Sequence, residues 1–570
     1  MNPNHVIAVA RGEKEADLLL ADARIVNVFS GEIVSGSLAI AGGRIAGMGD
    51  YAARRRTDLK GRYLCPGLID AHVHIESAMA SVTEFARAVL PLGTTTVVAD
   101  PHEIANVLGA DGIRYMLRSA ENQPMNICYS LPSCVPATEM ETSGARLDAE
   151  DLLPFMEEDR ILALAEMMNY PGVIYGDADV LKKIGLARAH RKPTDGHAPG
   201  LTGPELNAYL STGIASDHEC TTAPEAMEKL AAGMFIMVRE GTCARNLDAL
   251  FPAISERTAD RMMWCTDDRH PHDILDQGHL DYIVRRAIGL GLDPVTAIQM
   301  GTLNPARYFG IRDAGAIAPG YRADLMIFSD LDTPRAEQVY HGGRLVAEDG
   351  AILPEITRPA PVSVPRIMNL LPDDVDFTIP ARGRRIRVIE VVQDQVMTGR
   401  RETDAAVKDG MAVADVSRDL LKMAVVERYT GAGGTGLGFV TGLGLRRGAL
   451  ASSVAHDSHN IIVAGADDRD MKAALNAVVR MGGGMAVACD GAVRAELPLP
   501  IAGLMSDAPM PVIREQMDSL ISAARELGTR LHDPFMALGF LALPVIPDLK
   551  LTDKGLVDVT QFRIVPLFAD

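Results

Sequence analysis

The sequence predicts an α/β protein organised around a (β/α)₈ TIM-like barrel, with a small β-domain built from both flanks of the barrel and an additional C-terminal α/β domain. Three observations lead to this prediction. Strand-like and helix-like stretches alternate between residues 61 and 312, turn-rich β stretches lie on both sides of that segment, and a further α/β-like segment follows a Pro-rich stretch. A chain of 570 residues is too long for one hydrophobic core, so two or three domains are expected.

Both flanks of the predicted barrel are rich in short strands. Up to residue 60, β-rich runs alternate with turn pairs such as Gly42-Gly43 and Gly49-Asp50. A similar pattern returns after residue 312, where residues 323–328 and 339–343 again combine strand-like runs with turns. We therefore expect residues 1–60 and 313–355 to form one small β-domain around the segment between them.

The central segment, residues 61–312, contains eight strand-like runs: residues 64–69, 94–99, 126–131, 161–165, 194–196, 214–216, 235–238 and 262–265. Helix-like stretches separate several of them, for instance residues 83–92 and 224–232, and Thr222 with Glu225 predicts a capping box before the second of these helices. Eight strands in about 250 residues is the size of a (β/α)₈ barrel.

The end of the chain is predicted to be a linker, residues 356–382, and a C-terminal α/β domain, residues 383–570. This domain contains the Gly-rich residues 431–438, which match G-x-G-x-x-G. A dinucleotide site needs a strand before this motif and a helix after it, whereas residues 420–429 have a helical pattern and residues 439–441 a strand pattern. A nucleotide site is therefore not predicted here.

Charge limits the class of partner. The formal net charge of −19 argues against a nucleic acid or an anionic membrane surface, because both require clustered Lys and Arg. A small neutral or cationic substrate fits better.

Targeting signals are not evident. The first five residues carry no basic region followed by an apolar core, and the apolar residues 535–546 are too few to span a bilayer. The seven cysteines are spread out and contain no C-x-x-C pair, which indicates buried free thiols in a reducing compartment. We expect a cytoplasmic protein without membrane partners.

A His-x-His pair follows the first predicted barrel strand. Side chains alternate between the two faces of a strand, so His72 and His74 project from the same face while Val73 packs behind them. Two imidazoles on one face can bind one metal ion, although a single pair of this kind is also compatible with core histidines.

Further polar residues lie at the carboxyl ends of other predicted strands. Because the active sites of (β/α)₈ barrels lie at that end, these side chains should meet in one site. They are Asp100 and Glu103 after strand two, Glu166 after strand four, His197 after strand five, His218 after strand six, Arg239 and Glu240 after strand seven, and Asp267 after strand eight.

This set predicts two divalent ions a few ångströms apart, because Glu166 offers two oxygens that can bridge them. Mixed nitrogen and oxygen ligation suits Zn²⁺, Mn²⁺ or Fe²⁺. Such ions lower the pKa of bound water, and Asp267 is placed to take the proton and pass it to the leaving group. The predicted reaction class is metal-assisted hydrolysis; a capping role for Asp267 is the structural alternative.

Residues 455–460, Ala-His-Asp-Ser-His-Asn, combine four polar side chains beside the apolar residues 461–463. They either close over the mouth of the barrel or form a hydrogen-bonded turn, and the sequence leaves both possibilities open.

The chain resembles the amidohydrolase superfamily, through Pro66-Gly67-Leu68-Ile69-Asp70-Ala71-His72-Val73-His74 together with Gly315, Pro319-Gly320 and Ala323-Asp324-Leu325. More narrowly, it is similar to the bacterial adenine deaminases. That similarity rests on His72-Val73-His74-Ile75-Glu76-Ser77, Asp100-Pro101-His102-Glu103, Ala165-Glu166-Met167-Met168-Asn169, Asp195-Gly196-His197-Ala198-Pro199, Ser216-Asp217-His218-Glu219 and His456-Asp457-Ser458-His459-Asn460. It covers nearly the whole chain, including the C-terminal domain.

The resemblance implies hydrolysis of the purine base adenine to hypoxanthine and ammonia, as in purine salvage, with two divalent ions, Mn²⁺ or Fe²⁺ before Zn²⁺. A metal-bound hydroxide would attack C6 and Asp267 would shuttle its proton. The residues that match the family's metal ligands are His72, His74, Glu166, His197, His218 and Asp267. His218 and Glu103 are also expected to take part in catalysis, and we expect a homo-oligomer, most simply a dimer.

The remaining assignments stay open at this stage. Asp100 and Glu103 are candidates for substrate contact, proton relay or an accessory metal, with a polar loop as the alternative. Arg239 and Glu240 either contact the purine or form an ion pair at the rim. The candidate proton donors to the ring are Glu76, Glu103 and Glu219, and the further candidate substrate contacts are Glu76, His456 and His459.

Two competing functions are considered. One is another amidohydrolase activity, such as a cyclic amidase or an amino-sugar deacetylase, because its metal ligands would be much the same. The other is a non-catalytic assembly partner that keeps the barrel as a scaffold. Loss of ligands is expected in such a scaffold, and every predicted ligand is present here.

Overall fold

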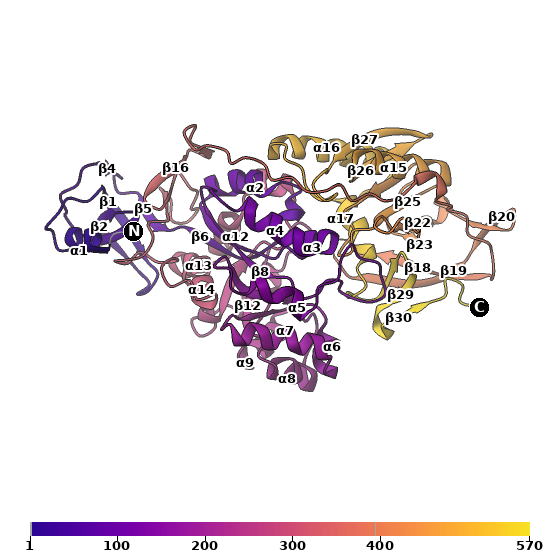
Figure 1. Cartoon of the computed structure of the whole chain (residues 1–570), viewed down its shortest axis with the longest axis horizontal. Helices are drawn as coiled ribbons and strands as arrows, with labels where there is room; N and C mark the ends of the chain where they lie inside the picture. The colour runs from indigo at the N-terminus through magenta and orange to yellow at the C-terminus, as the bar shows by residue number, and fades with distance from the viewer. Residues whose placement is uncertain (1–2, 394) are drawn as a thin grey trace.

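The computed structural model describes residues 3–393 and 395–570. A small β-sheet with the N-terminal helix α1 (Pro3–Ala10), the barrel, and a C-terminal region follow one another along the longest axis, and the two ends of the chain lie far apart (Figure 1). Met1 and Asn2, which belong to the segment inspected for a signal peptide, lie outside the described residues. Within the described part of the chain, none of the helices has the length and apolar character needed to cross a membrane.

The small β-sheet has nine strands drawn from both flanks of the barrel. Pairing of β5 with β1 on one side and with β14 on the other joins the N-terminal and returning segments in one sheet, as the predicted fold class requires, although β5 itself lies in the segment predicted as barrel. Its strands are β1 (Leu18–Asn27), β2 (Glu32–Ala41), β3 (Arg44–Met48), β4 (Arg56–Asp58), β5 (Tyr63–Pro66), β14 (Leu325–Phe328), β15 (Gln338–His341), β16 (Arg344–Glu348) and β17 (Ala351–Ile352).

The barrel consists of eight parallel strands, as predicted. β6 to β10 form one sheet and β11 to β13 another; single bridges between Thr194 and Ile214 and between Val73 and Asp267 join the two sheets on both sides. The strands are β6 (Leu68–Val73), β7 (Thr94–Ala99), β8 (Asn126–Leu131), β9 (Ile161–Met167), β10 (Thr194–Gly196), β11 (Ser216–Asp217), β12 (Phe235–Arg239) and β13 (Met262–Cys265).

The predicted first strand, residues 64–69, is two strands in the structure. β5 ends at Pro66 in the small β-sheet and β6 begins at Leu68 in the barrel. Gly67 lies between them, and a Cβ at this position would come within 2.2 Å of Thr95 Oγ1. Only glycine lets the chain pass so closely from one sheet into the other.

Helices surround the barrel strands. They are α2 (Val82–Val89), α3 (His102–Leu108), α4 (Ala110–Ser119), α5 (Ala149–Leu152), α6 (Tyr170–Tyr175), α7 (Ala178–Ala189), α8 (Gly203–Ser211), α9 (Ala223–Ala231), α10 (Leu247–Leu250), α11 (Pro271–Asp276), α12 (Leu280–Gly289), α13 (Pro294–Met300) and α14 (Leu303–Tyr308).

Two helix predictions need refinement. The predicted helix over residues 83–92 becomes α2 followed by a 3₁₀ turn (Leu90–Leu92), because Pro91 has no N–H to continue the α-helical bonds. Thr222 caps α9 by accepting from Glu225 N, but the Glu225 carboxylate accepts from Thr221 and Gly200 instead of closing the predicted box.

The C-terminal region is built on an eight-stranded, mainly antiparallel sheet. Its strands are β18 (Arg385–Val391), β19 (Thr398–Asp404), β22 (Leu421–Val426), β23 (Thr435–Thr441), β24 (Ala449–Ser452), β25 (Ile461–Gly465), β26 (Gly484–Cys489) and β27 (Ala492–Pro498). Smaller pairings are made by β20 (Ala406–Lys408) with β21 (Met411–Val413), and among β28 (Leu549–Thr552), β29 (Gly555–Asp558) and β30 (Arg563–Val565). The helices here are α15 (Asp468–Met481), α16 (Met510–Leu527) and α17 (Pro534–Gly539).

The helical prediction for residues 420–429 is wrong, because β22 occupies most of that stretch. β22 pairs with both β23 and β25 and is buried along its whole length. Apart from Lys422, residues 421–426 are all apolar, and such a short run has no period that separates a buried strand from a helix. The Gly-rich residues 431–434 are the turn between β22 and β23, so a strand and not a helix follows them, and the motif is not a dinucleotide fingerprint.

The barrel and the C-terminal region share one apolar cluster. It contains Met79 and Phe85 from the barrel and Met505 and Ile513 from the C-terminal region. Backbone bonds cross the same junction, because Ser506 N donates to Met79 O at 2.8 Å and Ser81 N donates to Ser506 O at 2.8 Å. The two parts are therefore packed as one body.

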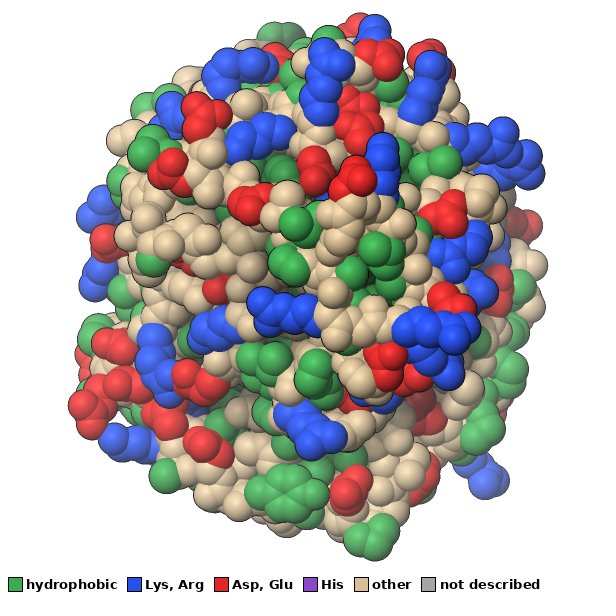
Figure 2. Space-filling model, turned by 90° about the vertical axis from the view of Figure 1, so that its right-hand side faces the viewer, with side chains coloured by type: hydrophobic (Ala, Val, Ile, Leu, Met, Phe, Trp, Pro, Cys, Tyr) green, Lys and Arg blue, Asp and Glu red, His purple; other side chains and the backbone are tan. Residues whose placement is uncertain are grey.

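Charged side chains of both signs cover the C-terminal end of the molecule. At the C-terminal end of the molecule, acidic and basic side chains are interspersed over the surface (Figure 2). Among the described residues, the seven cysteines form no disulfide; five are buried, and Cys128 and Cys243 are half-buried.

Candidate active site

Two imidazoles meet at the carboxyl end of β6. His72 is the second-last residue of this strand, and His74 is the first residue after it; their Nε2 atoms are 3.1 Å apart. Nδ1 of His74 lies 3.0 Å from the backbone oxygen of Asp100, which fixes the orientation of the ring. Both rings are buried, and their Nε2 atoms lie side by side.

Glu166, near the end of β9, lies between two pairs of imidazoles. Its Oε1 is 3.5 Å from His72 Nε2 and 3.3 Å from His74 Nε2. Its Oε2 is 2.6 Å from His197 Nδ1 and 3.2 Å from His218 Nε2. Each carboxylate oxygen therefore faces one pair, which is the placement that a bridging ligand requires.

Asp267 follows β13 with φ of +55°, a left-handed conformation that Asp adopts more readily than most residues. Its backbone N donates to His72 O at 3.0 Å, so it takes part in closing the barrel. Its Oδ1 lies 3.1 Å from His74 Nε2, and its Oδ2 accepts from Arg239 Nη1 at 2.8 Å. The side chain is held between the imidazoles and a guanidinium.

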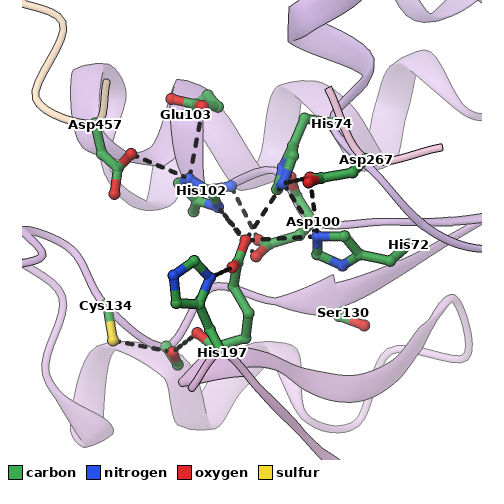
Figure 3. Close-up of polar contacts among 12 residues, drawn as sticks. His72, His74, Asp100, His102, Glu103, Ser130, Cys134, His197, Asp267 and Asp457 are labelled. Carbon is green, nitrogen blue, oxygen red and sulfur yellow. Dashed lines mark hydrogen bonds and ion pairs between the residues drawn. The ribbon is translucent and has the colours of Figure 1, made fainter. Parts of the chain in front are cut away.

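The strand-two motif brings a histidine into the same cluster. His102, at the start of α3, has Nδ1 3.0 Å from Asp100 Oδ2 and 3.5 Å from Glu166 Oε1. Its Nε2 lies 3.6 Å from Glu103 Oε1 (Figure 3). Asp100 thus orients His102 and does not itself line the central cavity.

Glu103 is held by two histidines of the C-terminal region. Its Oε1 is 2.5 Å from His456 Nδ1, and its Oε2 contacts His459 Nε2. The His456 ring also stacks on Phe540, with centroids 4.4 Å apart. Residues 455–460 therefore reach the barrel mouth, which is one of the two alternatives that the sequence left open.

Strand seven contributes an ion-pair network. Arg239 pairs with Glu219 through both terminal nitrogens and with Asp267. The neighbouring Glu240 accepts from Leu247 N at 2.8 Å and is not among the residues lining the central cavity. Glu76 lies behind the site and accepts from Ile104 N at 3.2 Å; burial raises its pKa to about 7.

Burial raises the pKa values of the carboxylates in the site, whereas the neighbouring cationic side chains lower them. Burial by itself raises the pKa of Glu166, but His218 and His197 outweigh it and hold that pKa well below its usual value. The same balance lowers the pKa of Glu103, through His456, and of Asp267, through Arg239. All three carboxylates are therefore ionised at neutral pH, which is the form that binds metals and accepts protons.

These side chains line one cavity at the mouth of the barrel. Its polar wall contains His74, His102, Glu103, Glu166, His197, His218, Glu219, Arg239, Asp267, Asp268, His456 and Asp457. Its apolar cover comes largely from the C-terminal region, with Val396, Met536, Phe540, Leu543 and Ile546. The cavity therefore combines a wall of imidazoles and charged groups with an apolar cover.

Comparisons with known proteins agree along the whole chain. The Amidohydrolase family profile matches residues 63–358, and the profile of the Adenine deaminase C-terminal domain matches residues 395–563. A protein named adenine deaminase from Desulfatibacillum aliphaticivorans is 56% identical over 568 residues, covering 100% of both chains. The chain belongs to the adenine deaminase family. A further relative with that name, from Kosmotoga olearia, is 49% identical over 574 residues, covering 100% of this chain and 99% of the relative. Another, from Methanothrix thermoacetophila, is 50% identical over 572 residues, covering 100% of both chains.

The amidohydrolases are metal-dependent, and the residues of this adenine deaminase family member fit a metal centre. Ligand atoms of His72, His74 and Asp267 lie within 4.8 Å of one another, as do those of His72, Glu166 and His218. Nε2 of His197 is buried without a hydrogen-bond partner among the described residues. Such a donor set, with four imidazoles and two carboxylates converging in a buried space, is typical of first-row divalent metals.

Sequence reasoning did not single out His102 and Asp268 as site residues. His102 lies between Asp100 and Glu103 in the strand-two motif, and this position between two candidate site residues was the sequence signal that could have identified it. Asp268 follows Asp267 directly; its Oδ1 accepts from Ser77, the last residue of the motif that begins at His72. Both residues line the cavity.

Proposed function

We propose that this chain hydrolyses adenine to hypoxanthine and ammonia with two divalent ions, Mn²⁺ or Fe²⁺ before Zn²⁺. The observation that carries the proposal is the match in full length and at 56% identity to a protein named adenine deaminase, combined with the convergence of the predicted ligands in one cavity. The enzyme would act on a free purine base in the cytoplasm, as a homodimer.

The residues that would hold the ions are His72, His74, Glu166, His197, His218 and Asp267. The support is geometric, since Glu166 presents one oxygen to His72 and His74 and the other to His197 and His218. When bound, divalent ions supply a hydroxide nucleophile at neutral pH, because they lower the pKa of water.

Asp267 is the proposed proton carrier. Its ionised carboxylate can accept a proton from the nucleophile and deliver it to the departing ammonia. Arg239 holds one carboxylate oxygen at 2.8 Å while the other faces His74, so the side chain has a fixed direction during transfer. Arg239 and Glu219 thus position Asp267, and Arg239 also reaches the cavity wall where the purine would lie.

Glu103 is the proposed proton relay to the ring nitrogen beside C6. Its carboxylate is ionised, so it would take a proton from His456 and pass it to the ring. It lines the cavity, and His456 and His459 each contact one of its oxygens, so both proton supply and orientation come from the C-terminal region. His456 would also contact the purine, because it lines the cavity with its ring stacked on Phe540. His218, which also lines the cavity, would stabilise charge at the reaction centre.

The other predicted contacts support the site from behind. Asp100 orients His102, Glu240 anchors the start of α10 through Leu247 N, and Glu76 holds the start of α3 through Ile104 N. We propose that these three residues act through their neighbours.

The test is an ammonia-release assay with adenine, adenosine, cytosine, guanine and dihydrouracil, on protein reconstituted in turn with Mn²⁺, Fe²⁺ and Zn²⁺. We expect release from adenine alone and no release after chelation. Turnover of dihydrouracil but not of adenine would replace the proposal with a cyclic amidase.

A further inference from the structure

A second group of histidines lies outside the catalytic cavity, where the first turn of α11 meets the residues just before α17. His270 and His272 come from the barrel, and His532 and Asp533 come from the C-terminal region. The ring centroids of His270 and His272 are 5.9 Å apart, and those of His272 and His532 are 5.5 Å apart. The mechanism proposed above uses none of these residues.

His272 is the unexplained member of this group. It is 8% exposed, and both of its ring nitrogens are buried without a hydrogen-bond partner in the described part of the chain. Leaving a buried donor or acceptor unpaired costs about 1–3 kcal/mol. Burial lowers the pKa of His272, so the ring is neutral and one nitrogen carries a free lone pair.

Asp273 adds an oxygen donor beside it. Its Oδ1 accepts from Gln277 and Arg245, whereas its Oδ2 is buried and has no hydrogen-bond partner among the residues described. This free oxygen lies 3.6 Å from His272 Nε2, which is too long for a hydrogen bond. Two ligands bound at about 2.0–2.1 Å to one tetrahedral ion lie about 3.4 Å apart, so the spacing suits a shared ion.

The ring separations agree with that geometry. An ion at about 2.1 Å from an imidazole nitrogen is about 3.2 Å from the ring centre, so two imidazoles on a tetrahedral ion have centres about 5.3 Å apart. The two separations here are 5.5 and 5.9 Å, and His197 and His218 in the catalytic cluster are 5.3 Å apart.

His270 also has the support that metal-binding histidines usually have. Its Nδ1 lies 2.6 Å from Asp533 Oδ2, which leaves Nε2 as the coordinating nitrogen. His532 is exposed and lines a separate cavity with Thr242, Arg245 and Gln277, so an ion can reach the group from solvent. The carboxylates of Asp273 and Asp533 favour a cation over an anion as the occupant.

We propose that His270, His272, His532 and Asp273 form a second, non-catalytic site for a divalent transition-metal ion such as Zn²⁺, which links the barrel to the C-terminal region. Three imidazoles and one carboxylate oxygen supply the four donors of a closed tetrahedral site. The site is independent of the proposed deamination.

The test compares Zn²⁺ uptake by the full-length wild-type protein and by His532→Ala, with His190→Gln as the histidine control. Each protein is stripped of metal with a chelator and desalted before Zn²⁺ is added. His532 is exposed, so its removal should not disturb folding. We expect wild type and His190→Gln to retain one more equivalent of Zn²⁺ per chain than His532→Ala, while adenine turnover of the metal-loaded proteins stays the same. Equal uptake by all three, or a further equivalent bound only at a large excess of Zn²⁺, would overturn the proposal.

Two measurements keep the site separate from the catalytic centre. Anomalous diffraction at the zinc edge should show a peak among His270, His272 and His532 in Zn²⁺-soaked crystals, and its absence counts against the site whatever the turnover. Asp533→Asn keeps the oxygen that caps α17 but loses the carboxylate beside His270, so it should weaken this ion's affinity about 10- to 100-fold. An unchanged affinity would contradict the assigned role of Asp533.

Discussion

Asp267 shows how one residue serves both the fold and the site. Its backbone closes the barrel through His72 O, and its carboxylate faces His74 on one side and Arg239 on the other. The left-handed backbone places both groups at once. A change at this position therefore affects chemistry without removing a core side chain.

Asp267→Asn should lower kcat by about 10²- to 10⁴-fold, because the amide cannot accept the proton. The far-UV circular dichroism and the melting temperature should stay close to those of the wild type. The exposed Asp332→Asn is the control. An Asp267→Asn protein with full turnover would show that another residue carries the proton.

A second residue-scale prediction concerns His459, which holds Glu103 without lining the cavity. His459→Ala should lower kcat about tenfold to a hundredfold with little change in KM, because Glu103 loses one of its two holding contacts. His459→Gln keeps an N–H donor and should recover much of this loss. If both variants behave alike, the ring does not act by positioning Glu103.

At the scale of elements, α9 fixes the strands that carry two of the proposed ligands. Lys229 on this helix is fully buried and donates to Asp217 Oδ2 at 2.9 Å, to Glu225 Oε1 at 2.7 Å and to Ala198 O at 2.7 Å. Asp217 precedes His218 and Ala198 follows His197. The lysine thus ties the ends of β10 and β11 to one helix.

Lys229→Met should destabilise the protein by about 3–5 kcal/mol, because it leaves the buried carboxylate of Asp217 without its cation. Urea denaturation followed by intrinsic fluorescence measures this change. Lys182→Met removes an exposed pair with Glu150 and should change stability by less than about 1 kcal/mol. Equal effects of the two substitutions would contradict the role given to Lys229.

Strand β28 carries a second buried lysine, which organises the cavity cover. Lys550 donates to Val396 O and Phe540 O, both at 2.9 Å, and those two residues line the cavity. Burial lowers the pKa of Lys550 to about 7. The charged lysine is thus disfavoured in the folded protein.

This pKa predicts a pH dependence of stability. Between pH 7 and the ordinary lysine pKa of 10.5, the unfolded chain binds a proton that the folded protein does not, so Lys550 makes stability rise with pH. Below pH 7, Lys550 is protonated in both the folded and the unfolded protein, so its contribution to stability no longer changes with pH. The melting temperature of the wild type, minus that of Lys550→Met, should therefore rise between pH 7 and pH 10. A flat difference would mean that the lysine titrates normally.

At the scale of the whole molecule, we expect residues 356–382 to be a linker between two parts that stay together without it. Arg366 and Arg382 in this segment are exposed. Ile356 of this segment belongs to the shared apolar cluster, and Val362, Val364 and Ile367 pack against it. The barrel and the C-terminal region also contact each other directly, through other members of that cluster and through Glu103 with His456 and His459.

Limited trypsin digestion should therefore cut first within residues 356–382, and the two fragments should elute together in gel filtration until denaturant is added. Much of the deaminase activity should survive the cut. Fragments that separate under native conditions would show that the linker holds the two parts together.

The sequence by itself determined the barrel, the two-flank β-domain and the family, because these depend on local patterns. Apolar runs with polar residues at their ends mark the parallel strands, and the rule that active sites lie at the carboxyl ends brings His72, Glu166, His218 and Asp267 into one prediction. Their mutual distances in the structure are those that such a site requires.

Other features were decided only by tertiary structure. The contact of Glu103 with His456 joins residues 353 positions apart, and no local pattern encodes such a pair. Residues 421–426 have an apolar run compatible with either a helix or a strand, and pairing with β23 and β25 makes them a strand. The histidine group around His272 exists because His532 and Asp533, just before α17, contact the start of α11. Local side-chain periodicity does not encode a contact between such distant parts of the chain.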